Sequence, residues 1–235
     1  MRAPRGLVVV SLAVMMGAIG EARAQSPTPA PVEGPVYAVT YVEVMPTSTA
    51  AALAILARYR DATGKESGNL RSEVVRRLDE PHQFVILEVW KDRTAFDAHG
   101  RSASAMVMRE KIAAIRNAPT DERVHTALAV GPIESKPARG AICVVTHVDV
   151  IPPRKDDGVA AVRQLADESR RHEGNLRFEV VQQTNRPNHF TVVEARKDAK
   201  ALEAHSMAPA TRRFRDMLAP ATGALYDERK YTLLD

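Results

Sequence analysis

A glutamate and a histidine stand at the same spacing in two separate parts of the chain. Glu88 opens and His99 closes the segment EVWKDRTAFDAH, and Glu194 and His205 bound EARKDAKALEAH in the same way. Each glutamate belongs to an apolar run, where a carboxylate must either pair with a cation or have a raised pKa. A carboxylate of raised pKa beside a histidine can accept a proton from a substrate hydroxyl. We therefore take Glu88 and His99 as candidate catalytic residues.

The same residues also have a structural interpretation, which the sequence leaves open. The Glu88 carboxylate could form an ion pair with Arg71 or Arg109. His99 could cap a helix or pack in the core. No second histidine stands at metal-ligand spacing from either histidine, so we expect no intrinsic metal site. Histidines elsewhere, such as His125, are expected at exposed turns or strand ends.

Aromatic residues near Glu88 indicate where a ring-shaped substrate could bind. Side chains alternate along a strand, so Phe84, Glu88 and Trp90 share one face. Trp90 is the only tryptophan, and it could form a flat wall for an aromatic ring or pack in the core. Tyr41, on an earlier strand, could direct its hydroxyl into the same pocket. The candidate substrate-binding residues are therefore Trp90, Phe84 and Tyr41.

The second set of residues repeats the first with changes. An arginine replaces the tryptophan, so the aromatic wall is lost there. We therefore assign the activity to the first set and regard the second as a scaffold. The equivalent residues of the second set are Glu194, His205, Arg196, Phe190 and His147.

These sets belong to a duplicated domain. Residues 37–129 align with 143–235 without a gap, and 30 of the 93 aligned positions are identical. The motif GNLR precedes both sets, at Gly68 and at Gly174. A period of 106 residues is far longer than the roughly 20–50 residues of a solenoid repeat. Two copies of one small fold are therefore predicted.

Hydrophobic periodicity predicts the elements of each copy. In the first copy, alternation and β-branched residues predict strands at 37–45, 70–78, 83–90 and 123–129. Helices are predicted at 49–63 and at 93–116, the second capped by Asp92 and interrupted near Gly100. In the second copy Asp198 caps and Pro209 interrupts the corresponding helix. The order β-α-β-β-α-β is that of a ferredoxin-like fold, with both helices on one face of an antiparallel sheet.

The other face of each sheet needs a partner, and the chain supplies one. A bare apolar sheet face on a domain this small is unstable alone. We expect the two α+β domains, at 36–130 and 142–235, to pair across the linker 131–141 as a single-chain pseudo-dimer. Charged residues that alternate on the second strand of each copy are expected to pair between the domains: Arg71, Glu73, Arg177 and Glu179.

The pattern E-x-W-x-D-x-x-A-x-x-x-H, preceded by GNLR, resembles the antibiotic biosynthesis monooxygenase (ABM) family. The resemblance covers both predicted domains and implies dimeric α+β barrels, here formed within one chain. It also implies an organic substrate bound between the sheet and the helices of each unit. The family spans cofactor-independent oxygenases of quinols and anthrones, haem-degrading enzymes, and members with no known reaction.

On this resemblance the expected function is cofactor-independent oxygenation of a small aromatic, quinol-like compound, with O2 as co-substrate. An electron-rich phenolate can itself give an electron to oxygen, so neither metal nor flavin is expected. The first alternative is a binding protein for an apolar metabolite that uses the same cavity. The second is haem binding or degradation through His99, although Thr40 and Tyr41 occupy the region where haem-degrading relatives use an asparagine.

The N-terminal residues indicate export. Residues 1–24 combine a basic start, an apolar stretch and a small-x-small cleavage site after Ala24, which is typical of a signal peptide; a retained anchor is the alternative. Residues 25–35 form a proline-rich tether. We expect a secreted or periplasmic protein with no membrane segment in its mature form. The formal net charge of +4 is interspersed rather than gathered in a basic stripe, so no nucleic-acid partner is expected.

Overall fold

The structure is a computed structural model that describes residues 34–133, 137 and 140–234. The predicted signal peptide at 1–24 lies outside the described residues, as do most of the predicted tether and part of the predicted linker. Within the described part, none of the helices has the length and apolar character needed to cross a bilayer.

Both halves follow the predicted order of strands and helices. The first half consists of β1 (Val36–Glu43), the 3₁₀ turn η1 (Pro46–Ser48), α1 (Thr49–Thr63), β2 (Asn69–Arg77), β3 (Gln83–Trp90), α2 (Arg93–His99), α3 (Ala103–Ala113) and β4 (Asp121–Ala129). The second half consists of β5 (Ile142–Asp149), η2 (Pro152–Arg154), α4 (Lys155–Ser169), β6 (Asn175–Gln183), β7 (His189–Arg196), α5 (Ala199–Ser206), α6 (Pro209–Leu218) and β8 (Asp227–Leu233). The predicted helical region at 93–116 divides into α2 and α3, as expected from Gly100.

Two local features set where α2 begins, and therefore where His99 lies. The Asp92 carboxylate accepts a hydrogen bond from the Ala95 backbone N–H at 2.7 Å, which confirms the predicted N-cap. Gly68 has a φ of +86°, a conformation that glycine adopts without steric cost. A Cβ atom at Gly68 would lie 2.7 Å from the Ala95 Cβ. The GNLR motif thus lets the turn before β2 pack directly against the first turn of α2.

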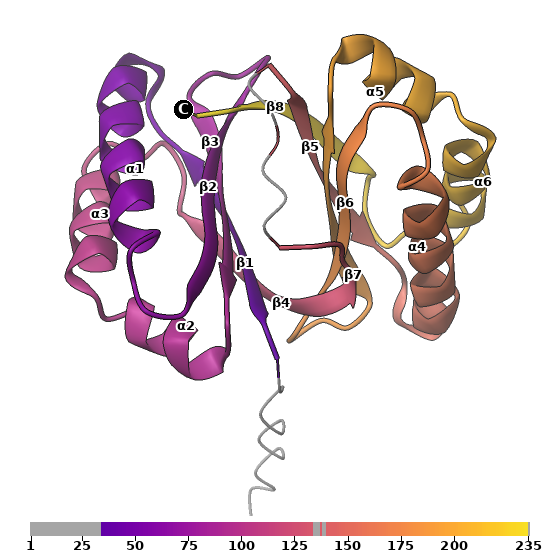
Figure 1. Ribbon diagram of the computed structural model, residues 1–235, viewed down its shortest axis with the longest axis horizontal. Helices are drawn as coiled ribbons and strands as arrows, with labels where there is room; N and C mark the ends of the chain where they lie inside the picture. Colours follow the sequence, from indigo (N-terminus) through magenta and orange to yellow (C-terminus); the bar gives the residue numbers. More distant parts are fainter. Residues whose placement is uncertain (1–33, 134–136, 138–139, 235) are drawn as a thin grey trace, which may run out of the picture. The chain divides into compact units, whose positions relative to one another are not determined.

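The strands join into one closed barrel. Each half has the strand order of a ferredoxin-like sheet, and among the described residues the full order is β1-β3-β2-β8-β5-β7-β6-β4. The halves meet where β2 pairs with β8 and β4 pairs with β6, both antiparallel. Figure 1 shows α1–α3 covering the outer face of the first sheet and α4–α6 covering that of the second. The predicted single-chain pairing is therefore confirmed, with hydrogen-bonded strands as well as facing sheets.

Strand alternation divides the side chains between the barrel interior and the helices. Even-numbered residues of β3, such as Phe84 and Ile86, pack under the helices of the first half. Odd-numbered residues, such as Val85 and Leu87, meet Val193 of the other half inside the barrel. Cys143 is buried in the same interior cluster.

Two buried ion pairs link the halves inside the barrel. The Arg71 guanidinium donates to both carboxylate oxygens of Glu179, at 2.9 and 2.6 Å. Arg177 donates to Glu73 in the same way, at 2.6 and 2.9 Å. All four side chains are buried. The predicted pairing between domains is confirmed, and Arg71 is thereby removed as a partner for Glu88.

Buried histidines make the stability of the fold depend on pH. Burial lowers the pKa of both His125 and His147 to about 4. The expectation that His125 is exposed was wrong, because its side chain lies inside the barrel beside Thr191. An unfolded chain has histidines of ordinary pKa, near 6.5, so it binds more protons than the native state between pH 6.5 and 4. The free energy of unfolding therefore decreases as the pH falls through this window.

We expect His125→Gln to reduce this pH dependence. The variant lacks the proton that His125 takes up on unfolding, so the slope of unfolding free energy against pH falls by up to about 1.4 kcal/mol per pH unit. Urea denaturation of both proteins at pH 7, 6 and 5 measures the two slopes. Equal slopes would show that His125 is already protonated in the native state.

Candidate active site

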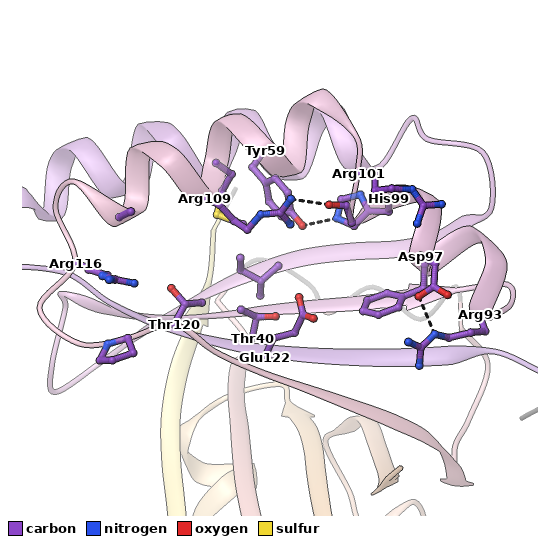
Figure 2. Close-up of a pocket in the computed structure, with 16 residues that line it drawn as sticks. Thr40, Tyr59, Arg93, Asp97, His99, Arg101, Arg109, Arg116, Thr120 and Glu122 are labelled. Carbon is purple, nitrogen blue, oxygen red and sulfur yellow. Dashed lines mark hydrogen bonds and ion pairs between the residues drawn. The ribbon is translucent and has the colours of Figure 1, made fainter. Parts of the chain in front are cut away.

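A cavity lies between the helices and the sheet of the first half. Its volume is about 730 Å³. The strands contribute Thr40, Ile86 and Glu122, whereas Tyr59 comes from α1 and His99 from the end of α2. Figure 2 shows Tyr59 and His99 above Thr40 and Glu122, with the space between them. This is the side of the sheet on which the substrate pocket was expected.

A chain of hydrogen bonds runs from the floor of this cavity toward solvent. The Tyr59 hydroxyl donates to the Glu88 carboxylate at 2.7 Å and lies 2.8 Å from His99 Nε2. The other ring nitrogen, Nδ1, lies 2.9 Å from the Glu66 carboxylate. Tyr59, Glu88 and His99 are all buried, whereas the Glu66 side chain is 23% exposed. The four residues thus connect a buried carboxylate to the surface.

The distances constrain the number of protons in this chain. When the Tyr59 hydroxyl donates to Glu88, the contact with His99 Nε2 is a hydrogen bond only if that nitrogen carries a hydrogen. Nδ1 must also carry one to bond the Glu66 carboxylate, so the imidazole ring is then a cation. Alternatively, a protonated Glu88 donates to Tyr59, Tyr59 donates to Nε2, and the ring is neutral. Both arrangements hold the same number of protons, and they differ only by a proton moved through Tyr59.

The electrostatic surroundings support a mobile proton. Burial raises the pKa of Glu88, against the opposing effects of His99 and of the hydrogen bond from Tyr59. Burial and then the Glu88 carboxylate raise the pKa of Tyr59, so its hydroxyl stays protonated and acts only as a carrier. Burial of Glu66 opposes ionisation, but hydrogen bonds from Ser104 and His99 lower the pKa of Glu66. Of the two carboxylates in the chain, Glu88 is therefore the stronger base.

The predicted residues of the first half fall into two groups. His99 lines the cavity, and Glu88 contacts the cavity-lining Tyr59. Trp90 is fully buried and stacks on the His99 ring, with the centroids 4.5 Å apart. Phe84 is a core residue under α1 and α3. Trp90 therefore supports the imidazole from behind, and neither it nor Phe84 forms part of the cavity wall.

Tyr41 and its counterpart His147 lie on the other face of the sheet. Odd-numbered residues of β1 and β5 point into the barrel, and Tyr41 packs against the interior core there. The Arg123 guanidinium lies 4.8 Å from the centroid of its ring. The neighbouring Thr40 lines the cavity instead. The structure thus does not bring Tyr41 to the predicted pocket, because it is one position out of phase with it.

Neither proposed ion-pair partner reaches Glu88. Arg71 binds Glu179, and Arg109 donates to the Gly100 carbonyl at 2.6 Å. In the second half, by contrast, Glu194 does form an ion pair, with Arg196 at 2.9 Å. The structural interpretation is therefore correct for the second glutamate only, and its partner is the residue that replaces Trp90.

The second half has lost the hydrogen-bonded chain. Leu165 stands at the position of Tyr59, so no hydroxyl lies between Glu194 and His205. Burial and then Arg196 lower the pKa of His205 to about 3, which keeps its ring neutral. Phe190 is fully buried in the core. A hollow of about 540 Å³ in this half is lined by α6 and residues 222–226, and includes none of the predicted second-half residues.

Sequence reasoning missed Tyr59 and Glu66. Tyr59 lies in the predicted helix at 49–63, where helical spacing alone accounts for it, and Glu66 lies between that helix and the predicted strand at 70–78. A signal was available, because both are polar positions at which the two copies differ: Leu165 and His172 replace them. Neither residue is close in sequence to Glu88, so only the folded chain shows the connection.

His99 is the residue that the haem alternative would use as a ligand. Both nitrogens of His99 are engaged, by Tyr59 and by Glu66, so neither is free to ligate iron. Across the described ranges 34–133 and 140–234, no group of three or more histidine, cysteine or acidic residues is placed to hold a metal ion.

The fold and the paired halves define a single-chain dimeric α+β barrel. The family model described as antibiotic biosynthesis monooxygenase matches residues 35–111 and again 141–217. The two matches cover more than half of the chain, which therefore belongs to the antibiotic biosynthesis monooxygenase family, with the domain in tandem. A comparison with curated protein sequences finds no match.

Solved structures share this architecture. A candidate monooxygenase from Fusobacterium nucleatum subsp. nucleatum superimposes with a TM-score of 0.75 at 17% identity, over 86% of this chain and 94% of its own. A candidate monooxygenase from Lactobacillus acidophilus superimposes with a TM-score of 0.70 at 14% identity, over 86% of this chain and 94% of its own. An anthrone oxidase-like protein superimposes with a TM-score of 0.68 at 14% identity, over 87% of this chain and 92% of its own. At these identities the similarity shows the fold, and its coverage shows that both halves are shared. The family itself supports a monooxygenase-type function.

Proposed function

We propose that the first half of the chain is an oxygenase that deprotonates a small aromatic, quinol-like substrate and lets the resulting anion react with O2. One observation carries the proposal: the hydrogen-bonded chain Glu88–Tyr59–His99–Glu66 borders the cavity of the first half and is missing from the second. Family membership supports the reaction class, and the volume of about 730 Å³ suits a substrate of a few rings.

Tyr59 is the residue through which the proton leaves the substrate. The substrate hydroxyl donates to the Tyr59 oxygen, and Tyr59 passes its own proton to Glu88. His99 Nε2–H donates to the same oxygen and stabilises the charge that develops there. Glu88 ends protonated, which its burial favours. The substrate becomes a phenolate or enolate inside the cavity.

The substrate then supplies the electrons for oxygen. The anion gives an electron to O2, and the two radicals join to form a carbon–oxygen bond. For a substrate with an activated CH2 group, the products are a carbonyl and one water molecule. One oxygen atom enters the carbonyl, and the other leaves as water with the two hydrogen atoms of the substrate. Glu88 returns its proton through Tyr59 during the loss of water. The proposed reaction requires neither metal nor flavin.

An oxygen electrode tests the proposal with a panel of hydroquinones, naphthols and anthrones. We expect stoichiometric consumption of O2 and substrate with at least one of them, and no effect of a chelator. His99→Asn should lower the rate at least tenfold, whereas the matched His205→Asn should not, because His205 belongs to the half without the chain.

Two results would contradict this function. Tight binding of panel compounds without oxygen consumption would identify a binding protein that uses the same cavity. Equal loss of activity in the His99→Asn and His205→Asn proteins would remove the assignment to the first half.

A further inference from the structure

The cavity of the first half is lined by more cations than anions. Four arginines and two acidic residues contribute to its wall: Arg93, Arg101, Arg109, Arg116, Asp97 and Glu122. Arg93 donates to Asp97 at 2.8 Å, so these two charges neutralise each other. Three guanidinium groups remain against the single carboxylate of Glu122. Within the described part of the chain, none of the three forms an ion pair.

A main-chain carbonyl holds Arg109 in place, and no described residue acts as its counterion. Its Nη2 donates to the Gly100 carbonyl at 2.6 Å, which ties α3 to the end of α2. Arg215, the equivalent residue of the second half, donates to the Ser206 carbonyl in the same way, at 3.1 Å. Arg215, however, also donates to the Glu228 carboxylate at 3.1 Å. In both halves the arginine is thus bonded to a main-chain carbonyl, but only Arg215 also binds a carboxylate.

The difference does not come from loss of the acidic residue. Glu122 is the equivalent of Glu228, and it lines the cavity without pairing with Arg109. In Figure 2, the Arg109 side chain runs below the helices toward His99 and ends beside the Tyr59 hydroxyl, above Thr40 and Glu122. Arg109 therefore presents guanidinium donors to the same space as the proton-carrying hydroxyl.

The second half also lacks the other two unpaired cations. Met207 stands at the position of Arg101, and Thr222 at that of Arg116. The excess of positive charge therefore accompanies the hydrogen-bonded chain, and both are confined to the first half. A structural role for these arginines in the fold would apply to both halves alike.

We propose that the first cavity takes a hydroxyaryl carboxylate, with its carboxylate bound by Arg109 together with Arg101 and Arg116. A planar guanidinium matches a carboxylate with two parallel, charge-assisted hydrogen bonds. The placement of the substrate hydroxyl at Tyr59 rests on the proposed function; the binding of the anion does not.

Calorimetric titration separates the charge from the shape of the ligand. The probes are 6-hydroxy-2-naphthoate and its neutral carboxamide, which have nearly the same size, at pH 7.5. We expect the naphthoate to bind at least tenfold more tightly, and this preference to shrink when NaCl is raised from 50 to 500 mM. Arg109→Gln should reduce the preference to less than threefold. The matched Arg215→Gln should keep it, because that arginine is neutralised by Glu228.

The outcomes distinguish this inference from the proposed function. Equal affinity for the two probes, no binding of either at millimolar concentration, or the same loss in both arginine variants would overturn the anion site. Oxygen consumption with neutral hydroxyarenes would then still support the oxygenase. Conversely, a preference for the naphthoate that depends on Arg109, without oxygen consumption by any panel compound, would keep the anion site and remove the oxygenase.

Discussion

Replacing Tyr59 with phenylalanine is expected to lower kcat for oxygen consumption by a factor on the order of 10²–10⁴, the range associated with a lost general acid–base group. The ring still fills its place under α3, but no hydroxyl remains to pass a proton between substrate and Glu88. The Glu88 carboxylate lies 3.8 Å from His99 Nε2, which is too far for a direct hydrogen bond. Steady-state kinetics with an active panel compound measures the effect, which should fall on kcat rather than KM.

Glu88→Gln and Tyr226→Phe are the companion variants for Tyr59→Phe. Glutamine keeps the shape of Glu88 and cannot take up the proton, so kcat should fall by a similar factor. Tyr226, in the second half, is the control for loss of a tyrosine hydroxyl, and its removal should leave kcat unchanged. If Tyr59→Phe retains wild-type kcat and is folded by circular dichroism, proton transfer through Tyr59 is disproved.

Arg71→Met is expected to lower the free energy of unfolding by about 3–5 kcal/mol, because it leaves a buried carboxylate without its partner. The Glu179 side chain is only 2% exposed, and Arg71 donates to both of its oxygens. Urea denaturation followed by circular dichroism measures the difference.

The double variant Arg71→Met/Glu179→Met separates the cost of an unpaired charge from the value of the pair. Two apolar side chains of similar length leave no buried charge at this pair, so most of the lost stability should return. A decrease of less than about 1 kcal/mol in the free energy of unfolding of Arg71→Met, the range of exposed ion pairs, would mean that solvent reaches Glu179. It would also mean that this pair does not hold the two halves together.

The two glutamates show how duplication separates structure from chemistry. Glu194 and Glu88 have the same strand position and are buried to the same degree. Arg196 neutralises Glu194. The Arg196 side chain is fully buried, at the position that Trp90 occupies in the first half. Trp90 cannot neutralise Glu88, which is therefore left to share a proton with Tyr59 and His99. One substitution at the end of a strand thus decides whether the carboxylate is structural or able to accept a proton.

The family fold was predictable from the sequence because it depends on local and repeated signals. Strand alternation placed Phe84, Glu88 and Trp90 on one face. Asp92 was recognised as a helix cap, and the gapless repeat implied two pairing domains. Each of these signals lies within one element or repeats at a constant spacing, so neighbouring residues suffice to read it.

The candidate site was predictable only in part. The burial of Glu88 and the presence of His99 nearby followed from their spacing. The assignment of Trp90 to a substrate wall did not anticipate that it stacks behind the imidazole. Strand alternation predicts on which face of the sheet a side chain lies. It does not predict which of the side chains on that face border a cavity.

The sequence alone determined that this protein is a duplicated α+β barrel in which two glutamates on apolar strands and two histidines near a helix end stand at equivalent places. Tertiary structure decided which glutamate is free to exchange a proton. Tyr59 and Glu66 meet His99 across 40 and 33 residues of chain. Among the described residues Arg109 has no ion-pair partner, whereas Arg215 pairs with Glu228. Such differences arise from contacts between elements, where distances of a few ångströms separate an ion pair from an open cavity, and no local pattern in the chain records them.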